Sequence, residues 1–335
     1  GEKGVDARGI LALTFTNKAA EEMRQRISAR LGVEKTGAWL GTFHSFGLYI
    51  LRREIDRLGR SKQFTIFDDA DQLSLMKRLI KDLGAQAASL SPRDALSWIG
   101  KHKQDVAAPD ETPPPQPGED VYRTLWGRYH DTLRRAGAVD FDDLLVLPAQ
   151  LFDGHADVRR NYAERYRYVL IDEYQDTNRA QYLLARHLSS AHGNIFVVGD
   201  EDQSIYSWRG ASIRNILDFE SDFQNARVFR LEQNYRSTGP ILKAANAVVK
   251  NNTKRLGKTL WTRNEAGDPV RFFEAPDAEA EARFVADDIV EKKISPRQAA
   301  VLFRTNGQVR LVEEAMRRKG LAYVVVGGVR FYARK

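Results

Sequence analysis

Two adjacent carboxylates follow a short apolar run near the middle of the chain. Asp172 and Glu173 come directly after residues 168–171. Because open parallel sheets bind ligands at the carboxyl ends of their strands, both acids are expected at such an edge. There Asp172 could hold the magnesium ion of a nucleoside triphosphate, and Glu173 could orient or deprotonate an attacking water. The same pattern arises wherever a strand runs into a polar loop, so by itself it leaves both interpretations open.

A second polar segment follows the apolar residues 194–198. It brings Gln203 to the same expected edge and then presents Tyr206, Trp208 and Arg209 in a loop. Aromatic rings beside a guanidinium are suited to stacking unpaired bases and holding phosphates. The alternative is a core tryptophan beside a solvated arginine, and residue types alone do not decide between the two.

Three further segments carry polar or aromatic groups near element ends. Phe15 and Asn17 lie in one of these segments and His44 lies in another, and either segment could bind a nucleic-acid strand. A lone histidine is more often a structural residue, and His44 lacks metal-ligand spacing. The acids at positions 140, 142 and 143 could form a metal cluster, or they could cap the start of a helix.

Tyr235 and Arg236 follow an apolar stretch, residues 228–231, that is expected to form a strand. They mark the junction of two α/β units, where a tyrosine could stack on a base and an arginine could respond to closure of the cleft. Further on, Lys258 lies in a segment that resembles the end of a phosphate-binding loop. That loop requires glycine at position 252, and this chain has Asn252. No complete phosphate-binding loop occurs in the 335 residues.

The elements that must position these residues alternate between strands and helices. Residues 9–16, 168–171 and 194–198 are apolar runs typical of parallel strands buried on both faces. Helices are expected from Asn17, as a cap, to the residue before Gly32, and over residues 179–188. Strand, helix and strand in this order predict an α/β fold with a doubly wound parallel sheet.

Two other regions complete the expected organisation. Residues 62–139 have helical periodicity and predict an inserted helical subdomain, interrupted by the proline-rich residues 112–118. After position 236 a second α/β unit is expected, with strands at 270–274, 299–303 and 322–326 and helices at 278–292 and 309–319.

Composition narrows the class of protein. A chain of 335 residues with 42% hydrophobic and 29% charged residues predicts two globular domains. No apolar run approaches the roughly 18 residues of a spanning helix, so no membrane association is expected. The absence of cysteine excludes disulfide frameworks and thiolate zinc sites and favours a cytoplasmic protein. A net charge of +7 favours a polyanionic partner such as nucleic acid.

Five ordered segments together closely resemble UvrD/PcrA/Rep-type superfamily 1 DNA helicases. They are residues 10–20, 41–45, 171–178, 199–210 and 231–237. Residues 326–334 resemble a further motif of the second motor domain of that family. The resemblance implies RecA-like domains: a first at residues 1–61 and 140–236, the helical insertion at 62–139, and the start of a second at 237–335.

The same resemblance implies a role for each candidate residue, with ATP and Mg²⁺ as cofactors. Asp172 would bind magnesium, Glu173 would activate water and Gln203 would sense the terminal phosphate. Arg236 would act as an arginine finger, and Tyr235 would stack on adenine. The track for single-stranded DNA would include Phe15, Asn17, His44, Tyr206, Trp208 and Arg209. The implied activity is 3′ to 5′ translocation on single-stranded DNA and at DNA junctions, in repair or replication restart.

The chain also departs from the family pattern. The phosphate-binding loop and the later motifs of the second motor domain are missing, so we expect an internal fragment of a helicase that is inactive alone. One alternative is a non-catalytic helicase-like module that binds DNA. The other is the helicase part of a helicase-nuclease. The sequence does not indicate a protein partner.

Overall fold

The computed structural model describes residues 4–105, 120–253 and 255–326. It divides into two compact units, residues 1–232 with 247–260 and residues 233–246 with 261–335. The sequence pattern did not indicate that residues 247–260 return to the first unit. The proline-rich residues 112–118, and all of the segment 326–334 except Val326, lie outside the described residues.

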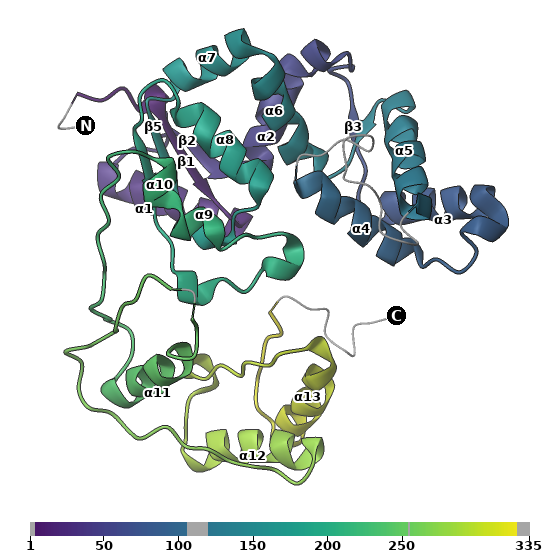
Figure 1. Ribbon diagram of the computed structural model, residues 1–335. Helices are drawn as coiled ribbons and strands as arrows, with labels where there is room; N and C mark the ends of the chain where they lie inside the picture. Colours follow the sequence, from purple (N-terminus) through teal and green to yellow (C-terminus); the bar gives the residue numbers. More distant parts are fainter. Residues whose placement is uncertain (1–3, 106–119, 254, 327–335) are drawn as a thin grey trace. The chain divides into compact units, whose positions relative to one another are not determined.

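A four-stranded parallel sheet forms the centre of the first unit (Figure 1). Its strands are β1 (Ile10–Thr14), β2 (Trp39–Thr42), β5 (Tyr168–Ile171) and β6 (Ile195–Val197). They lie in the order β2-β1-β5-β6, and every neighbouring pair is parallel. Helices α1 (Asn17–Leu31) and α8 (Arg179–Ser189) follow β1 and β5 in the chain. The predicted α/β fold class with a parallel sheet is therefore confirmed.

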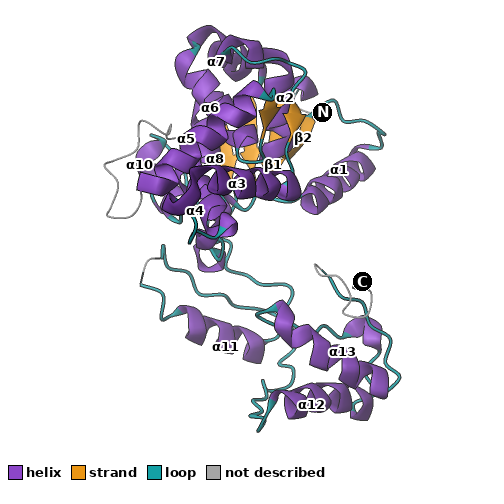
Figure 2. Ribbon diagram, turned by 90° about the vertical axis from the view of Figure 1, so that its right-hand side faces the viewer, coloured by secondary structure: helices purple, strands orange, loops and turns teal. Residues whose placement is uncertain are grey.

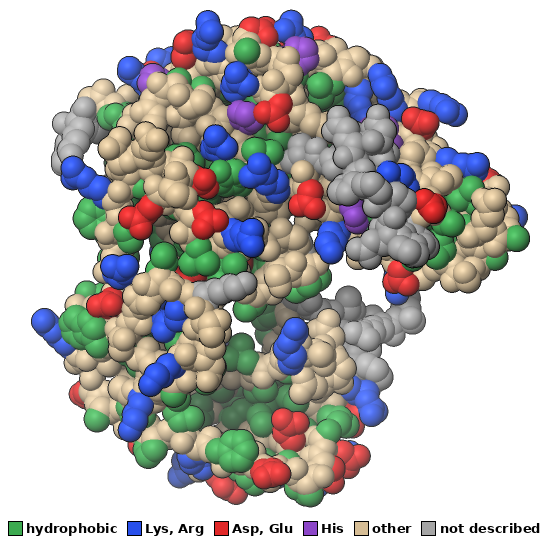
Figure 3. Space-filling view, in the orientation of Figure 1, with side chains coloured by type: hydrophobic (Ala, Val, Ile, Leu, Met, Phe, Trp, Pro, Cys, Tyr) green, Lys and Arg blue, Asp and Glu red, His purple; other side chains and the backbone are tan. Residues whose placement is uncertain are grey.

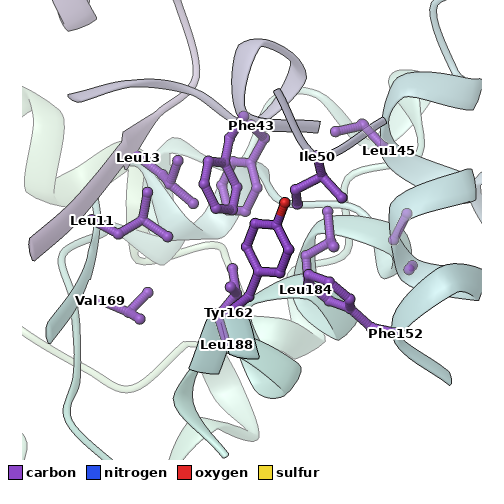
Figure 4. Close-up of a cluster of buried hydrophobic side chains, with 14 of the residues drawn as sticks. Leu11, Leu13, Phe43, Ile50, Leu145, Phe152, Tyr162, Val169, Leu184 and Leu188 are labelled. Carbon is purple, nitrogen blue, oxygen red and sulfur yellow. The ribbon is translucent and has the colours of Figure 1, made fainter. Parts of the chain in front are cut away.

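One face of this sheet forms the main core. Leu11 and Leu13 of β1 lie beside Val169 and Ile171 of β5, and all four side chains are buried. Figure 4 shows these strands presenting their side chains toward Phe43 and the neighbouring helices. The covering helices are α2 (Phe43–Glu54), α6 (Asp143–Gly154), α7 (Ala156–Arg165) and α8. Because each such apolar side chain contributes about 1.5–3 kcal/mol when buried, this core holds the sheet edge in place.

The expectations for the cap of α1 and for the burial of β6 were wrong. The cap of α1 is Thr16, whose side chain accepts the backbone N–H of Ala19 at 3.1 Å, and Asn17 is the first helical residue. Both residue types cap helices well, so the end of β1 decides which of them is the cap. Residues 194–198 do not form a doubly buried strand, because β6 is an edge strand and Phe196 is 59% exposed.

Three helices between β3 and β4 share a core of their own and lie to one side of the sheet in Figure 1. They are α3 (Asp69–Leu83), α4 (Pro92–Gln104) and α5 (Asp120–Arg135), and each contacts the other two. In Figure 2, which views the molecule from that side, α3 and α4 lie in front of the strands. Trp126 and Tyr129 are fully buried among them. Two short parallel strands that were not expected, β3 (Thr65–Ile66) and β4 (Ala138–Val139), pair where the chain enters and leaves this group.

The second unit contains the expected helices without the expected strands. Helices α12 (Ala278–Glu291) and α13 (Val309–Arg318) pack through Ala286 and Met316. Helix α11 (Gly239–Val249) begins in this unit. In the described chain, residues 270–274, 299–303 and 322–326 form no strand, and neither do residues 228–231 of the first unit. Phe272 and Leu302 are 90% and 94% exposed. An apolar run becomes a strand only when a neighbouring strand completes its hydrogen bonds, and among the described residues these runs have no such neighbour.

The chain also contains two short α-helices and eight 3-10 turns among the described residues. Helices α9 (Arg214–Leu217) and α10 (Phe219–Asp222) follow the polar segment after β6. The 3-10 turns are η1 (Ala7–Gly9), η2 (Ile55–Leu58), η3 (Gly84–Gln86), η4 (Tyr174–Asp176), η5 (Glu201–Gln203), η6 (Ser207–Arg209), η7 (Pro296–Gln298) and η8 (Asn306–Gln308). Among the residues that the structure describes, no helix has the length and apolar character needed to cross a membrane.

Candidate functional site

The two predicted acids lie at the carboxyl edge of the sheet. The N–H of Asp172 continues the β1–β5 ladder by donating to the carbonyl oxygen of Leu13 at 2.9 Å. Burial raises the pKa of Asp172 above its usual value. The backbone N–H of Glu173 donates to the carboxylate of Asp172 at 3.0 Å, and this hydrogen bond opposes the rise in that pKa. The adjacent charge of Glu173 adds to the rise in that pKa. The side chain of Glu173 is exposed, so it can reach a ligand at this edge.

Gln203 joins this pair through a chain of hydrogen bonds. It lies in η5, and its amide nitrogen donates to Oδ2 of Asp200 at 2.7 Å. The N–H of Asp200 donates to Oε1 of Gln175 at 3.0 Å. Nε2 of Gln175 in turn donates to Oε2 of Glu173 at 2.9 Å. The structure therefore brings Asp172, Glu173 and Gln203 into one connected cluster, with Gln175 as a member that the sequence analysis missed.

Lys258, from the incomplete phosphate-loop pattern, is engaged by acids of this same cluster. Its ammonium donates to the carboxylates of Asp200 and Glu201. Nearby, Arg255 pairs with Asp202 at 2.6 Å. These contacts hold residues 247–260 against η5. In this structure Lys258 therefore stabilises the loop that carries Gln203, and it does not lie at the end of a phosphate-binding loop.

Asp172 is the carboxylate of this edge that could take part in holding a divalent cation. Among the described residues, no three acids or histidines gather into a group that could hold a metal ion. Magnesium commonly uses one or two carboxylates together with waters and substrate phosphates. Asp172, half-buried at a strand end, matches the single carboxylate of such a site.

Aromatic rings form a short ladder in the same unit. Phe15, directly after β1, stacks on Tyr206 with ring centroids 5.2 Å apart. Tyr206 lies 6.4 Å from Trp208 in a tilted arrangement. Trp208 is 69% exposed, which contradicts the alternative of a core tryptophan. Phe15, Tyr206 and Trp208 thus bring three aromatic rings close together, and aromatic rings are the side chains on which unpaired bases stack.

His44 forms a second aromatic pair, with a partner that the sequence analysis missed. Its ring stacks on Phe141 with centroids 4.1 Å apart. Burial lowers the pKa of His44 to about 4, so this ring is neutral at pH 7. Phe141 is 54% exposed although it is large and apolar. Its position between acids in the sequence carries no sign of this contact, because the two rings come from distant segments.

The other two predicted DNA contacts are placed only in part. Asn17 is exposed in the first turn of α1, two residues after Phe15. Arg209 ends η6, and its side chain lies outside the described part of the structure. Gly210 follows in the left-handed conformation, with φ of 83°. A Cβ at Gly210 would come 1.6 Å from Oε1 of Gln104, so the η6 turn approaches α4 closely.

The acids near position 140 form a buried network around a lysine. Lys103 of α4 donates to Asp140 and to Asp143 at 2.7 Å each, and all three residues are buried. Although burial lowers the pKa of Lys103, the two carboxylates raise it by more, above its usual value. The backbone N–H groups of Asp140 and Asp143 each donate to the other residue's carboxylate. The helix-start interpretation was thus right in part, and the metal-cluster interpretation was wrong because an ammonium occupies this position.

Tyr235 and Arg236 belong to the second unit. Oδ1 of Asn234 accepts the backbone N–H groups of Arg236 at 2.9 Å and of Ser237 at 2.7 Å. This turn precedes α11 and presents Tyr235, which is 77% exposed, together with the exposed Arg236. Both side chains are therefore accessible to a ligand of this unit.

The surface charges do not add a further signal. Figure 3 shows Lys and Arg side chains interspersed with Asp and Glu on the face it presents, with no single basic patch among the described residues of that face. The aromatic rings at the sheet edge are thus a more specific feature than the net charge.

Comparison with known proteins assigns both units to helicase families. The UvrD/REP helicase N-terminal domain family matches residues 1–224, and the UvrD-like helicase C-terminal domain family matches residues 229–335. The chain is 44% identical to the ATP-dependent DNA helicase PcrA of Bacillus subtilis, over 100% of this chain and 46% of that protein. The PcrA proteins of Staphylococcus epidermidis and Staphylococcus aureus are 41% identical, with the same coverage. The chain thus spans about half the length of the curated relatives it matches.

Proposed function

Because the chain belongs to the UvrD/REP helicase family, we propose that it forms part of an ATP-dependent DNA helicase that moves 3′ to 5′ on single-stranded DNA. The observation that carries this proposal is the connected cluster of Asp172, Glu173 and Gln203 on the sheet edge where Phe15 and His44 also lie. With a nucleotide site and a base-stacking surface on the same sheet edge, hydrolysis of ATP would change how tightly the protein binds single-stranded DNA. We propose DNA repair or replication restart as the setting, with DNA junctions among the substrates.

Each residue of the cluster takes a distinct role in this proposal. Asp172 would hold the magnesium ion, which would neutralise charge on the ATP phosphates. Glu173 would accept a proton from the attacking water, and Gln203 would contact the terminal phosphate. Tyr235 would stack on adenine, and Arg236 would offset charge on the transferred phosphoryl group.

We also propose how the chain is divided. Residues 1–61 and 140–236 would form a first RecA-like motor domain, residues 62–139 its helical insertion, and residues 237–335 part of a second. The separate core of α3, α4 and α5 supports the insertion. The Lys103 network would join α4 to the loop that carries Phe141.

The stacking surface can be tested by removing Trp208. Trp208→Ala is expected to weaken binding of single-stranded DNA by ~1–3 kcal/mol, the usual range for one stacked base. Because Trp208 is 69% exposed, its removal leaves almost no cavity, so thermal stability should change little. Trp261→Ala, at an exposed tryptophan of the second unit, is the control for loss of a ring. DNA affinity equal to that of the parent, measured by fluorescence anisotropy, would remove Trp208 from the DNA track.

Phosphate release separates the motor from a non-catalytic module. The 335-residue chain contains no complete phosphate-binding loop, so we expect it to show no DNA-stimulated ATP hydrolysis. The full-length protein is expected to hydrolyse ATP with magnesium and single-stranded DNA present. Turnover by the purified chain would contradict its expected inactivity. A full-length protein that binds DNA without turnover would favour the module.

A further inference from the structure

We propose that Gln175 is a positioning residue that orients the carboxylate of Glu173 and joins it to the loop carrying Gln203. This inference rests on the proposed function, because it assigns Gln175 a part in ATP hydrolysis. Gln175 lies in η4, directly after the two acids, and is 1% exposed. A glutamine buried to this degree requires partners for both ends of its carboxamide.

The partners of Gln175 match its two ends. The amide nitrogen, which can only donate, faces Oε2 of Glu173 at 2.9 Å and Oδ2 of Asp176 at 3.4 Å. The amide oxygen, which can only accept, receives the N–H of Asp200 at 3.0 Å. Turning the carboxamide over would set oxygen against carboxylate oxygen and N–H against N–H. Its orientation is therefore determined by the neighbours on both sides.

The surrounding backbone is shaped for this bridge. Glu173 has φ of 53° and ψ of 44°, a left-handed conformation that is uncommon for a residue other than glycine. Such a conformation costs of order 1–3 kcal/mol and persists only where neighbouring contacts hold it. On the other side, a Cβ at Gly199 would come 2.7 Å from Oε1 of Gln175. Glycine at this position lets the β6 end approach the carboxamide.

The bridge has a direct consequence for water activation. Glu173 is exposed, and a free carboxylate on a flexible side chain would spend much of its time in unproductive rotamers. The hydrogen bond from Gln175 restricts those rotamers and aims the carboxylate. Through Asp200, whose Oδ2 accepts from Gln203, the same residue ties the base to the proposed phosphate sensor. Lys258 holds Asp200 from the other side.

The bridge itself can be tested in the 335-residue chain without any activity. Amide hydrogen exchange measured by NMR should show a protected N–H at Asp200 that exchanges at least ~10-fold faster in Gln175→Met, because the accepting oxygen is gone. Gln181→Met is the matched control, since Gln181 is also buried and its Oε1 also accepts a backbone N–H, from Asn178 at 2.9 Å. Unchanged exchange at Asp200 in Gln175→Met would overturn the bridge.

The positioning role can be tested by kinetics of the full-length protein. Gln175→Glu keeps the oxygen that accepts from Asp200 and loses the donor to Glu173. We expect it to lower kcat for DNA-stimulated ATP hydrolysis by up to ~100-fold, the effect of a misplaced catalytic group, with KM for ATP nearly unchanged. Gln181→Met should leave kcat at the parental value. Because Gln175→Glu preserves the size of the side chain, its kinetics decide whether Gln175 positions Glu173 even if Gln175→Met does not fold.

A double variant distinguishes positioning from general damage. If Gln175 acts through Glu173, adding Gln175→Glu to Glu173→Gln should lower the remaining rate by less than about 2-fold. If the double variant instead loses rate by the product of the two single-variant factors, the positioning role is overturned. A parent protein without DNA-stimulated hydrolysis would instead end the proposed function, and the exchange at Asp200 would still show whether the bridge exists.

Discussion

Glu173→Gln is expected to abolish nearly all ATP hydrolysis by the full-length protein while leaving ATP binding intact. The substitution keeps the shape of the side chain and removes its ability to accept a proton. A positioned general base contributes ~10²–10⁴-fold in other enzymes, so we expect kcat to fall by that factor. Phosphate release at saturating single-stranded DNA measures the fall, and equilibrium binding of a fluorescent ATP analogue measures what is retained.

Asp172→Asn provides the comparison for this variant. Asp172 precedes Glu173 at the same strand end, and its proposed task is to hold magnesium. Its replacement should therefore raise the magnesium concentration needed for half-maximal binding of nucleotide, whereas Glu173→Gln should not. An identical magnesium dependence in the two variants would refute this division of roles. A Glu173→Gln protein that hydrolyses ATP at the parental rate would remove Glu173 as the base.

Arg236→Lys is expected to slow hydrolysis at least ~100-fold while changing ATP affinity little. Arginine fingers in other phosphoryl-transfer enzymes contribute ~10³–10⁵ in rate, and lysine keeps the charge but loses the planar fork of donors. The backbone at Arg236 is held by Asn234 at 2.9 Å, so the substitution leaves the turn in place. Steady-state kinetics at saturating DNA provide the measurement.

Two further variants make this result specific. Arg297→Lys, at an exposed arginine of η7 in the same unit, should leave kcat unchanged. Tyr235→Ala should raise KM for ATP and spare more of the maximal rate, because stacking on adenine affects binding. An Arg236→Lys enzyme with the parental kcat would place this arginine outside the catalytic site.

Local patterns in the sequence were sufficient for the elements that carry the site. The apolar runs before Asp172 and Phe15 predicted β5 and β1, and the spacing of apolar residues up to Gly32 predicted α1. These signals are local, because backbone propensity and burial on both faces act on consecutive residues. The ordered motifs also identified the helicase family, which the matches to residues 1–224 and 229–335 confirm. The individual site roles stay predictions.

The expectations that failed depended on neighbours. The apolar runs of the second unit, such as the one containing Phe272, have strand-like composition and no strand partner in the described residues. The run at β6 has the composition of a central strand and lies at an edge. Composition does not distinguish these cases, because pairing is supplied by other parts of the chain.

The sequence by itself determined which residues could do chemistry and that Phe15 and Asp172 follow strands, and only the tertiary structure decided which of the candidate residues are connected. Gln175 looks like one polar residue among several after Glu173, and its bridge to Asp200 spans 25 positions. Lys103 lies 37 positions from Asp140, and Lys258 lies 58 from Asp200. Hydrogen bonds and ion pairs of this kind depend on donor and acceptor geometry within a few ångströms, which packing of distant segments creates.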